Sequence, residues 1–289
     1  MEKIKFTQEE KDNFNNSFLE AYFLGKGHHG TAYIYPSDDK KVVLITNEYD
    51  EDELGRLITI TSKLKEQGVN LPIIYDFFRT GKNQVCVLED RIVGVAVCNN
   101  GTHGENKNKW LRLLSLPDQM VSKLFEDIEA IVNSGVMLDI FKPDNLIWTP
   151  QGYAFIDLHN PNNELMYLTK EVALASFGIC DNLICESINE VGKKNQREFR
   201  ESLILQTACF FKLTRGLCLA NIDEEEKDKT LSLVTDKWQK NVDMARKVYP
   251  HVSKGEKLED AIEKLNNKIN ASNQEGGLND ALLLTSMVP

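Results

Sequence analysis

The sequence has no long apolar run, no basic block and no CxxC motif, and each absence argues against a class of protein. No stretch of about 18 apolar residues occurs, so we expect no membrane span. The first residues, Met1 to Phe6, lack the apolar core of a signal peptide. Lys and Arg total 34 against 44 Asp and Glu, a formal net charge of −10. This balance argues against a nucleic-acid partner, because contacts to phosphates require clustered cations.

The six cysteines lie among apolar residues. We therefore expect reduced thiols that pack as small core residues. A disulfide or metal pair at Cys180 and Cys185 is the alternative. Reduced thiols predict a cytoplasmic protein, and a protein exported into a host cytosol would have the same composition.

A glycine-rich stretch with the spacing GxGxxG lies at Gly25, Gly27 and Gly30. Three glycines let a hairpin turn approach a phosphate closely, where a Cβ atom would clash. Strand-like runs flank the glycines on both sides, which argues against a Rossmann dinucleotide site, where a helix follows. A structural hairpin without a ligand is the alternative.

Alternating apolar runs after the glycines predict a sheet. The expected strands follow at 33–35, 41–45, 71–78 and 85–90. An apolar stripe with acidic residues at its start predicts one helix over 50–66, which Gly68 ends. Together with the strand-like run before the glycines, these four strands predict a five-stranded sheet with one helix. Lys40 and Lys41 precede the third strand and are expected to be solvated.

The region 136–159 reads as strand, polar loop, strand, short turn and strand, with Asp139, Lys142, Asn145 and Asp157 at the strand ends. Periodic apolar positions predict one helix over 118–133 and mainly helices after residue 165. A short helix is also expected near the start. The expected helices are 8–22, 118–133, 168–178, 195–219, 223–247 and 256–271.

Residues 20–220 resemble the protein-kinase-like fold, through the glycine hairpin, the Lys142-Pro143-Asp144-Asn145 loop and Asp157 at the end of a strand. The resemblance implies an α+β, bilobal fold. Its N-terminal lobe would hold a five-stranded antiparallel sheet with one helix, and its C-terminal lobe would be mainly helical. The implied boundaries are an extension at 1–22, the two lobes at 23–98 and 99–272, and a flexible tail at 273–289.

The resemblance also implies roles for individual residues. Asn145 and Asp157 would hold Mg²⁺ against the phosphates of ATP. Gly25, Gly27 and Gly30 would cover those phosphates, and Lys26 would add a cation from the same loop. Lys142 would neutralise the transferred phosphate. The backbone of Glu89, Asp90 and Arg91 would contact adenine as a hinge between the lobes.

Three positions depart from the family pattern, and one of them is His159, which replaces the glycine two residues after Asp157. Ile140 stands where the family has its catalytic Asp, and an apolar side chain cannot accept a proton. Asp139, one residue earlier, is either the base or a structural residue. Leu44 or Thr46 stands where the family has a third-strand Lys, so its usual helix partner, Glu53, is either a functional acid or a surface residue.

Three functions follow from this pattern. The first is an atypical phosphotransferase that uses ATP and Mg²⁺, most simply a protein kinase acting on hydroxyl groups. The second is a pseudokinase that serves as a binding module, with or without nucleotide. The third is a small-molecule kinase related to aminoglycoside or choline phosphotransferases. A protein partner fits the first two, and the composition would suit a bacterial effector.

Overall fold

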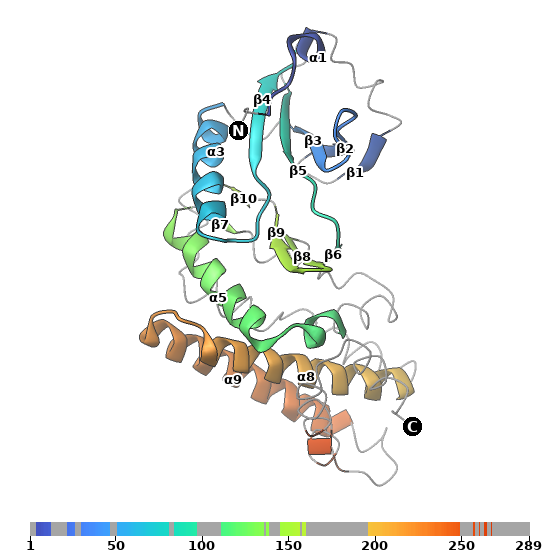
Figure 1. Ribbon diagram of the computed structural model, residues 1–289. Helices are drawn as coiled ribbons and strands as arrows, with labels where there is room; N and C mark the ends of the chain where they lie inside the picture. Colours follow the sequence, from blue (N-terminus) through green and yellow to red (C-terminus); the bar gives the residue numbers. More distant parts are fainter. Residues whose placement is uncertain are drawn as a thin grey trace. The chain divides into compact units, whose positions relative to one another are not determined.

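The computed structural model describes about three fifths of the chain in two compact units (Figure 1). The described residues are 4–12, 22–26, 30–46, 51–80, 84–96, 111–135, 137–138, 145–156, 158–159, 196–248 and five single positions between 257 and 267. Unit 1 comprises Met1–Gly94, Ala130–Leu138 and Ala154–Glu164. Unit 2 comprises Val95–Glu129, Asp139–Tyr153 and Leu165–Pro289. Each unit is described by itself.

Unit 1 contains a five-stranded sheet in the order β1-β2-β3-β5-β4, and every neighbouring pair is antiparallel. The strands are β1 (Phe23–Lys26), β2 (Gly30–Ile34), β3 (Lys41–Thr46), β4 (Ile74–Arg79) and β5 (Val85–Asp90). The predicted five-stranded antiparallel sheet is therefore confirmed. The coarse α+β class is confirmed with it.

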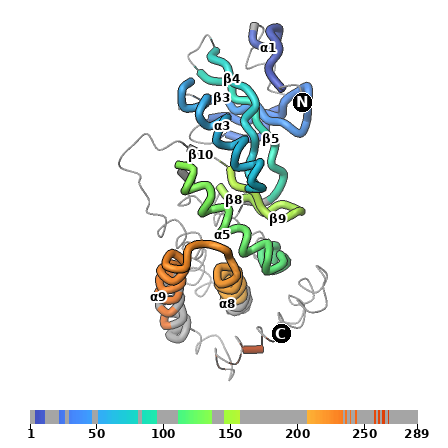
Figure 2. The backbone as a smooth tube through the Cα atoms, turned by 60° about the vertical axis from the view of Figure 1, so that its left-hand side comes forward, coloured from blue at the N-terminus to red at the C-terminus, as the bar shows by residue number. Residues whose placement is uncertain are grey.

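One face of this sheet is apolar and buried. Its core cluster consists of Phe6, Tyr35, Val43, Ile45, Cys86 and Leu88. Phe6 lies outside the sheet and immediately precedes α1 (Gln8–Asp12), which lies above the strands in both Figure 1 and Figure 2. Burying such an aromatic side chain contributes roughly 1.5–3 kcal/mol. Phe6 thus forms part of the core of unit 1.

The predicted helix beside the sheet is α3 (Glu51–Glu66), which lies next to β4 in Figure 1. Leu54, Leu57 and Leu64 form its buried stripe. Gly68 follows with a φ of 85°, a left-handed conformation that glycine adopts without strain. The helix predicted over 50–66 is confirmed.

Five short strands lie between residues 95 and 159 in the described part of the chain, before and after a long helix. The pairs are β7 (Met137–Leu138) with β10 (Leu158–His159), and β6 (Val95–Ala96) with β8 (Leu146–Thr149), which neighbours β9 (Gly152–Phe155). The three predicted strands and the turn between the last two of them are confirmed here. The loop residues 139–144 themselves lie outside the described residues.

The described part of unit 2 contains three long helices. They are α5 (Asp118–Asn133), α8 (Gln196–Leu219) and α9 (Glu224–Val248), and the first also extends into unit 1. These bounds agree with the helices predicted at 118–133, 195–219 and 223–247. The first helix expected over 8–22 is described only as α1. The helix predicted at 168–178, nearly all of that at 256–271 and the tail at 273–289 lie outside the described residues.

Two carboxylates, Asp127, which is buried, and Asp118, which is partly buried, hold unit 2 together. Asp127 accepts hydrogen bonds from the Tyr153 hydroxyl at 2.7 Å and the Lys123 ammonium at 2.6 Å. Asp118, in the first turn of α5, lies 2.6 Å from the Lys212 ammonium, whose side chain is 1% exposed. A charge buried this deeply requires such a partner, because desolvation is otherwise costly. Lys212 therefore ties α8 to α5.

Three cysteines lie within the described residues, and they differ in their exposure to solvent. Cys86 and Cys209 are buried free thiols, as expected. Burial raises the pKa of Cys86 to about 12, which suppresses thiolate formation. Cys218 is exposed, so the expectation of a core thiol is wrong there. It lies near the end of α8, where the helix turns one side toward solvent. Across the described ranges, no helix combines the length and hydrophobicity needed to cross a bilayer.

Candidate functional site

The glycine-rich stretch forms an antiparallel hairpin at an edge of the five-stranded sheet. Gly25 and Lys26 lie on β1, and Gly30 begins β2. The register pairs Gly25 with Ala32 and Lys26 with Thr31. Gly27 lies outside the described residues. The predicted hairpin is confirmed, and the Lys26 side chain on it is exposed.

The first and third glycines of the motif differ in their surroundings. A Cβ atom on Gly30 would lie 2.4 Å from the Ile45 carbonyl oxygen and 3.2 Å from the Leu44 side chain. A Cβ atom on Gly25 would meet nothing within 4 Å. Gly30 is therefore required by the contact between β2 and β3, and Gly25 has no such packing reason.

The third strand presents no ammonium group on the face of the glycine hairpin. Leu44 pairs with Ala32, and Thr46 pairs with Gly30. Directly paired residues point to the same face of a sheet. Thr46 is 2% exposed. At the two positions where the kinase-like family would have its third-strand Lys, this chain thus has an apolar side chain and a buried hydroxyl group.

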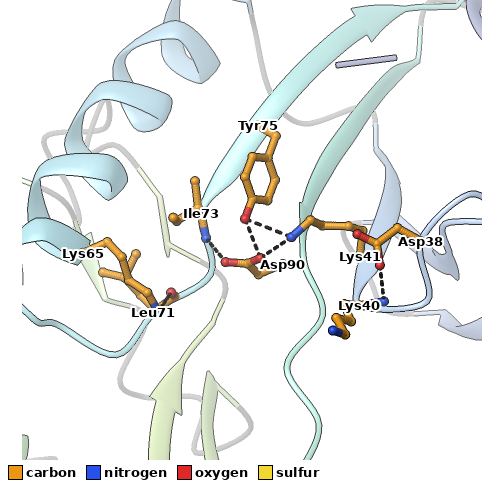
Figure 3. Close-up of polar contacts among 8 residues, drawn as sticks. All are labelled: Asp38, Lys40, Lys41, Lys65, Leu71, Ile73, Tyr75 and Asp90. Atoms are coloured by element: carbon orange, nitrogen blue, oxygen red, sulfur yellow. Dashed lines mark hydrogen bonds and ion pairs between the residues drawn. The ribbon is translucent and has the colours of Figure 1, made fainter. Parts of the chain in front are cut away.

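Lys41 is the buried cation of this strand, and its environment corrects the sequence expectation (Figure 3). Its ammonium donates to Asp90 Oδ1 at 2.9 Å and to the Tyr75 hydroxyl oxygen at 2.9 Å. It also lies 4.2 Å from the centroid of the Tyr75 ring. Lys40 is exposed as expected, but Lys41 is not solvated. Alternation along β3 puts Lys41 on the face opposite Leu44 and Thr46.

Asp90 accepts hydrogen bonds from three groups. Besides Lys41, the Tyr75 hydroxyl donates to Oδ1 at 2.7 Å and the Ile73 amide to Oδ2 at 3.0 Å. Burial by itself would raise the pKa of Asp90, but these hydrogen bonds outweigh it and hold the pKa below its ordinary value. Burial would lower the pKa of Lys41, and its bonds to Asp90 and Tyr75 instead raise it. The pair is therefore ionised at neutral pH.

The backbone at the end of β5, where the hinge is predicted, is already hydrogen-bonded to the protein. The Asp90 amide donates to the Ile73 carbonyl at 3.1 Å. The Arg91 amide donates to the Lys40 carbonyl at 2.8 Å. Glu89 pairs with Val42 in the sheet. An adenine base at this edge would have to use carbonyl groups or residues beyond Arg91, so the predicted hinge contact stays a prediction.

Glu53 is buried on α3, with 9% of its surface exposed. The alternative prediction, that Glu53 is a surface residue, is therefore wrong. The first turn of α3 points this carboxylate inward, whereas Glu51 and Asp52 beside it are exposed. Glu53 makes polar interactions within the fold. Its role as a functional acid stays a prediction.

The predicted metal and catalytic residues are described only in part. Asn145 is 8% exposed and directly precedes β8, in unit 2. Asp139, Lys142 and Asp157 lie outside the described residues. Within the described ranges, no group of three or more His, Cys, Asp or Glu side chains is placed to hold a metal ion.

Comparison with known proteins gives no family for this chain. No model of a known protein family matches it, and no curated protein does. The site must therefore be argued from its own residues. Sequence reasoning missed Lys41 and Tyr75, although one signal was present. Lys41 and Asp90 carry opposite charges at the ends of two predicted strands that an antiparallel register would bring together.

Proposed function

We propose that this protein is an atypical phosphotransferase with a bilobal protein-kinase-like fold. It transfers the γ-phosphoryl group of ATP to a hydroxyl oxygen of a protein substrate, and ADP leaves. The observation that carries the proposal is the arrangement of unit 1. A glycine hairpin joins β1 and β2 of a five-stranded antiparallel sheet. Along the chain, one helix follows β3 and precedes β4. This is the arrangement that the sequence resemblance implies.

Each proposed role follows from the chemistry of the side chain. The amide oxygen of Asn145 and the carboxylate of Asp157 are hard ligands of the kind Mg²⁺ prefers, and the ion would neutralise phosphate charge. Gly25 offers an open backbone surface to the phosphates. Lys142 would act as a cation toward the transferred group. Asp139 would accept the hydroxyl proton.

The side chains of β3 favour a second function, that of a nucleotide-binding pseudokinase. Neither Leu44 nor Thr46 can replace the phosphate-binding ammonium of the family. Lys41 cannot replace it either, because its ammonium is held by Asp90 and Tyr75 on the other face of the strand. Phosphoryl transfer depends mainly on positioning and charge neutralisation, so a missing cation lowers the rate heavily.

The first experiment measures nucleotide binding by thermal unfolding with ATP and Mg²⁺. At a ligand concentration 100 times the dissociation constant, the free energy of unfolding should rise by about 2.7 kcal/mol. The absence of a shift would exclude both nucleotide-dependent functions. Asp157→Ala should abolish the Mg²⁺-dependent part of the shift, and Asp39→Ala, an exposed turn residue, serves as the matched control.

A glycine pair separates ligand binding from folding. Gly25→Ala should leave the melting temperature nearly unchanged and weaken ATP binding, since the added methyl group meets open space that the phosphates would occupy. Gly30→Ala should lower the melting temperature even without ATP. If Gly25→Ala binds ATP as well as the wild type, the hairpin does not cover the phosphates.

Transfer of labelled phosphate then separates the two functions. An enzyme loses transfer on Asp139→Ala and on Asp157→Ala, and a pseudokinase binds ATP without transfer in any variant. Full transfer by Asp139→Ala would show that Asp139 is not the base.

A further inference from the structure

Residues 4–12 dock on the apolar face of the sheet like a bound peptide. Phe6 is 6% exposed, and its ring lies edge-on to those of Tyr35 and Phe78, with centroids 6.0 and 4.8 Å apart. Most of the neighbouring side chains of the segment, such as Lys5 and Gln8, are exposed. A single aromatic side chain therefore anchors the segment.

Polar groups fix the position of the segment around this anchor. The Phe6 amide donates to Asp76 Oδ2 at 3.0 Å, and the Lys11 ammonium lies 3.4 Å from the same oxygen. At the other side, Glu10 Oε1 accepts hydrogen bonds from the Tyr35 hydroxyl at 2.7 Å and the Ser37 hydroxyl at 3.2 Å. Sheet and segment thus each contribute a carboxylate to the contact.

The segment also carries its own helix start. The Thr7 amide donates to Glu10 Oε2 at 2.7 Å, and the Glu10 amide donates to Thr7 Oγ1 at 3.1 Å. This reciprocal pair is a capping box, which stabilises the first turn of a helix locally. Glu10 therefore shapes the segment and attaches it to Tyr35 at the same time.

The sheet does not depend on this segment for its strand pairing. The strands β1 to β5 pair with one another, and residues 4–12 contribute no strand to the sheet. Without Phe6, however, the buried face of Val43, Ile45, Cys86 and Leu88 would lose one of the aromatic rings that cover it and would be partly open. An apolar face of this kind, rimmed by polar groups, is typical of a protein interaction site.

We propose that this face of the sheet is a peptide-docking site that residues 4–12 occupy in cis. Its partner in trans is a protein segment with the same chemistry: an aromatic residue, a hydroxyl residue one position later, Glu four positions later and a cation after it. Docking of the partner displaces residues 4–12. This site is independent of the proposed nucleotide site.

The test uses the full chain and a labelled peptide of residues 4–12. The Phe6→Ala protein should bind the peptide saturably by fluorescence anisotropy. The wild-type protein should bind at least tenfold more weakly, because its own segment occupies the site. A peptide with Phe6→Ala should bind neither protein. Glu10→Ala in the peptide should weaken binding several-fold, and Glu9→Ala, at an exposed position, should not.

Three outcomes would overturn the proposal. They are no binding by a Phe6→Ala protein whose circular dichroism matches the wild type, equal binding by both proteins, and exchange of the segment between two copies as a concentration-dependent dimer. If Phe6→Ala fails to fold, the Glu10→Ala/Lys11→Ala protein loosens the segment but keeps the buried ring. It should then bind the peptide more tightly than the wild type does, and equal binding again contradicts the site.

Discussion

Lys41 and Asp90 connect three strands through one ion pair. Lys41 begins β3, Asp90 ends β5, and the pair also contacts Tyr75 on β4. The side chains are 10% and 23% exposed, so solvent screens this pair less than a surface salt bridge. The contact holds the end of β5 where the chain leaves the sheet.

Replacing Lys41 with Met should lower the free energy of unfolding by about 1.5–3 kcal/mol, because Asp90 loses a charged hydrogen-bond donor and remains partly buried. Chemical denaturation measures the change. The neighbouring substitution Lys40→Met, at an exposed position, should stay within about 0.5 kcal/mol of the wild type. Equal effects of the two substitutions would contradict the buried pair.

The lowered pKa of Asp90 predicts how stability depends on pH. An unfolded Asp has a pKa of about 3.9, so this carboxylate stabilises the fold fully above that pH. As the pH falls through the lower folded pKa, the unfolded state binds more protons and the contribution is lost. Denaturation between about pH 5 and 3 should show a shallower loss for Asp90→Asn than for the wild type. The control Asp39→Asn should keep the wild-type slope.

At the scale of elements, α5 and α8 pack closely because of one glycine. A Cβ atom on Gly216 would lie 2.3 Å from Val121 Cγ1 and 3.0 Å from the Val121 carbonyl carbon. Backbone cannot give way as a flexible side chain does. The missing side chain therefore sets how near the two helices lie.

Gly216→Ala should destabilise the protein by about 1–3 kcal/mol despite the better helix propensity of Ala. Gly55→Ala on α3 is the matched control, since Gly55 is exposed and a Cβ atom there meets nothing within 4 Å. That change should stabilise by about 0.5–1 kcal/mol. Thermal unfolding of both variants measures the difference. A stabilised Gly216→Ala would contradict the close contact.

The elements were largely predictable, and the reason is periodicity. The apolar stripe Leu54, Leu57 and Leu64 defines α3, and alternation defines β3 and β5. Two features carried no such signal. Lys41 pairs with a residue 49 positions later, and Phe6 packs on strands that follow it by about 30 to 80 residues. Long-range contacts of this kind depend on strand register, which a local pattern does not determine.

The sequence predicted the glycine hairpin of the candidate site, but it did not predict the polar contacts of the site. The spacing of Gly25 and Gly30 correctly indicated a hairpin between strands. Counting from the glycines placed the family Lys position at Leu44 or Thr46, and the register now puts both residues on the glycine face. The burial of Glu53 was not evident, because acidic residues at a helix start are usually solvated.

For the whole molecule, charge gives the clearest expectation. The net charge of −10 provides no attraction for polyanions. Neither a labelled single strand nor a duplex should bind at about 50 mM salt, where phosphate contacts are strongest. Fluorescence anisotropy tests this. Binding that weakens steeply with added salt would reveal a basic surface and contradict the prediction.

The close approach of Gly30 to Ile45 changes how natural sequence variants should be interpreted. Any relative with this pair of strands would keep a glycine there, whether or not it binds a nucleotide. An unvarying residue at position 30 would thus report on folding. Variation at position 25, where a side chain is accommodated, would report on the ligand. The proposed nucleotide site thus predicts that a lineage in which the site is lost should lose Gly25 first and retain Gly30.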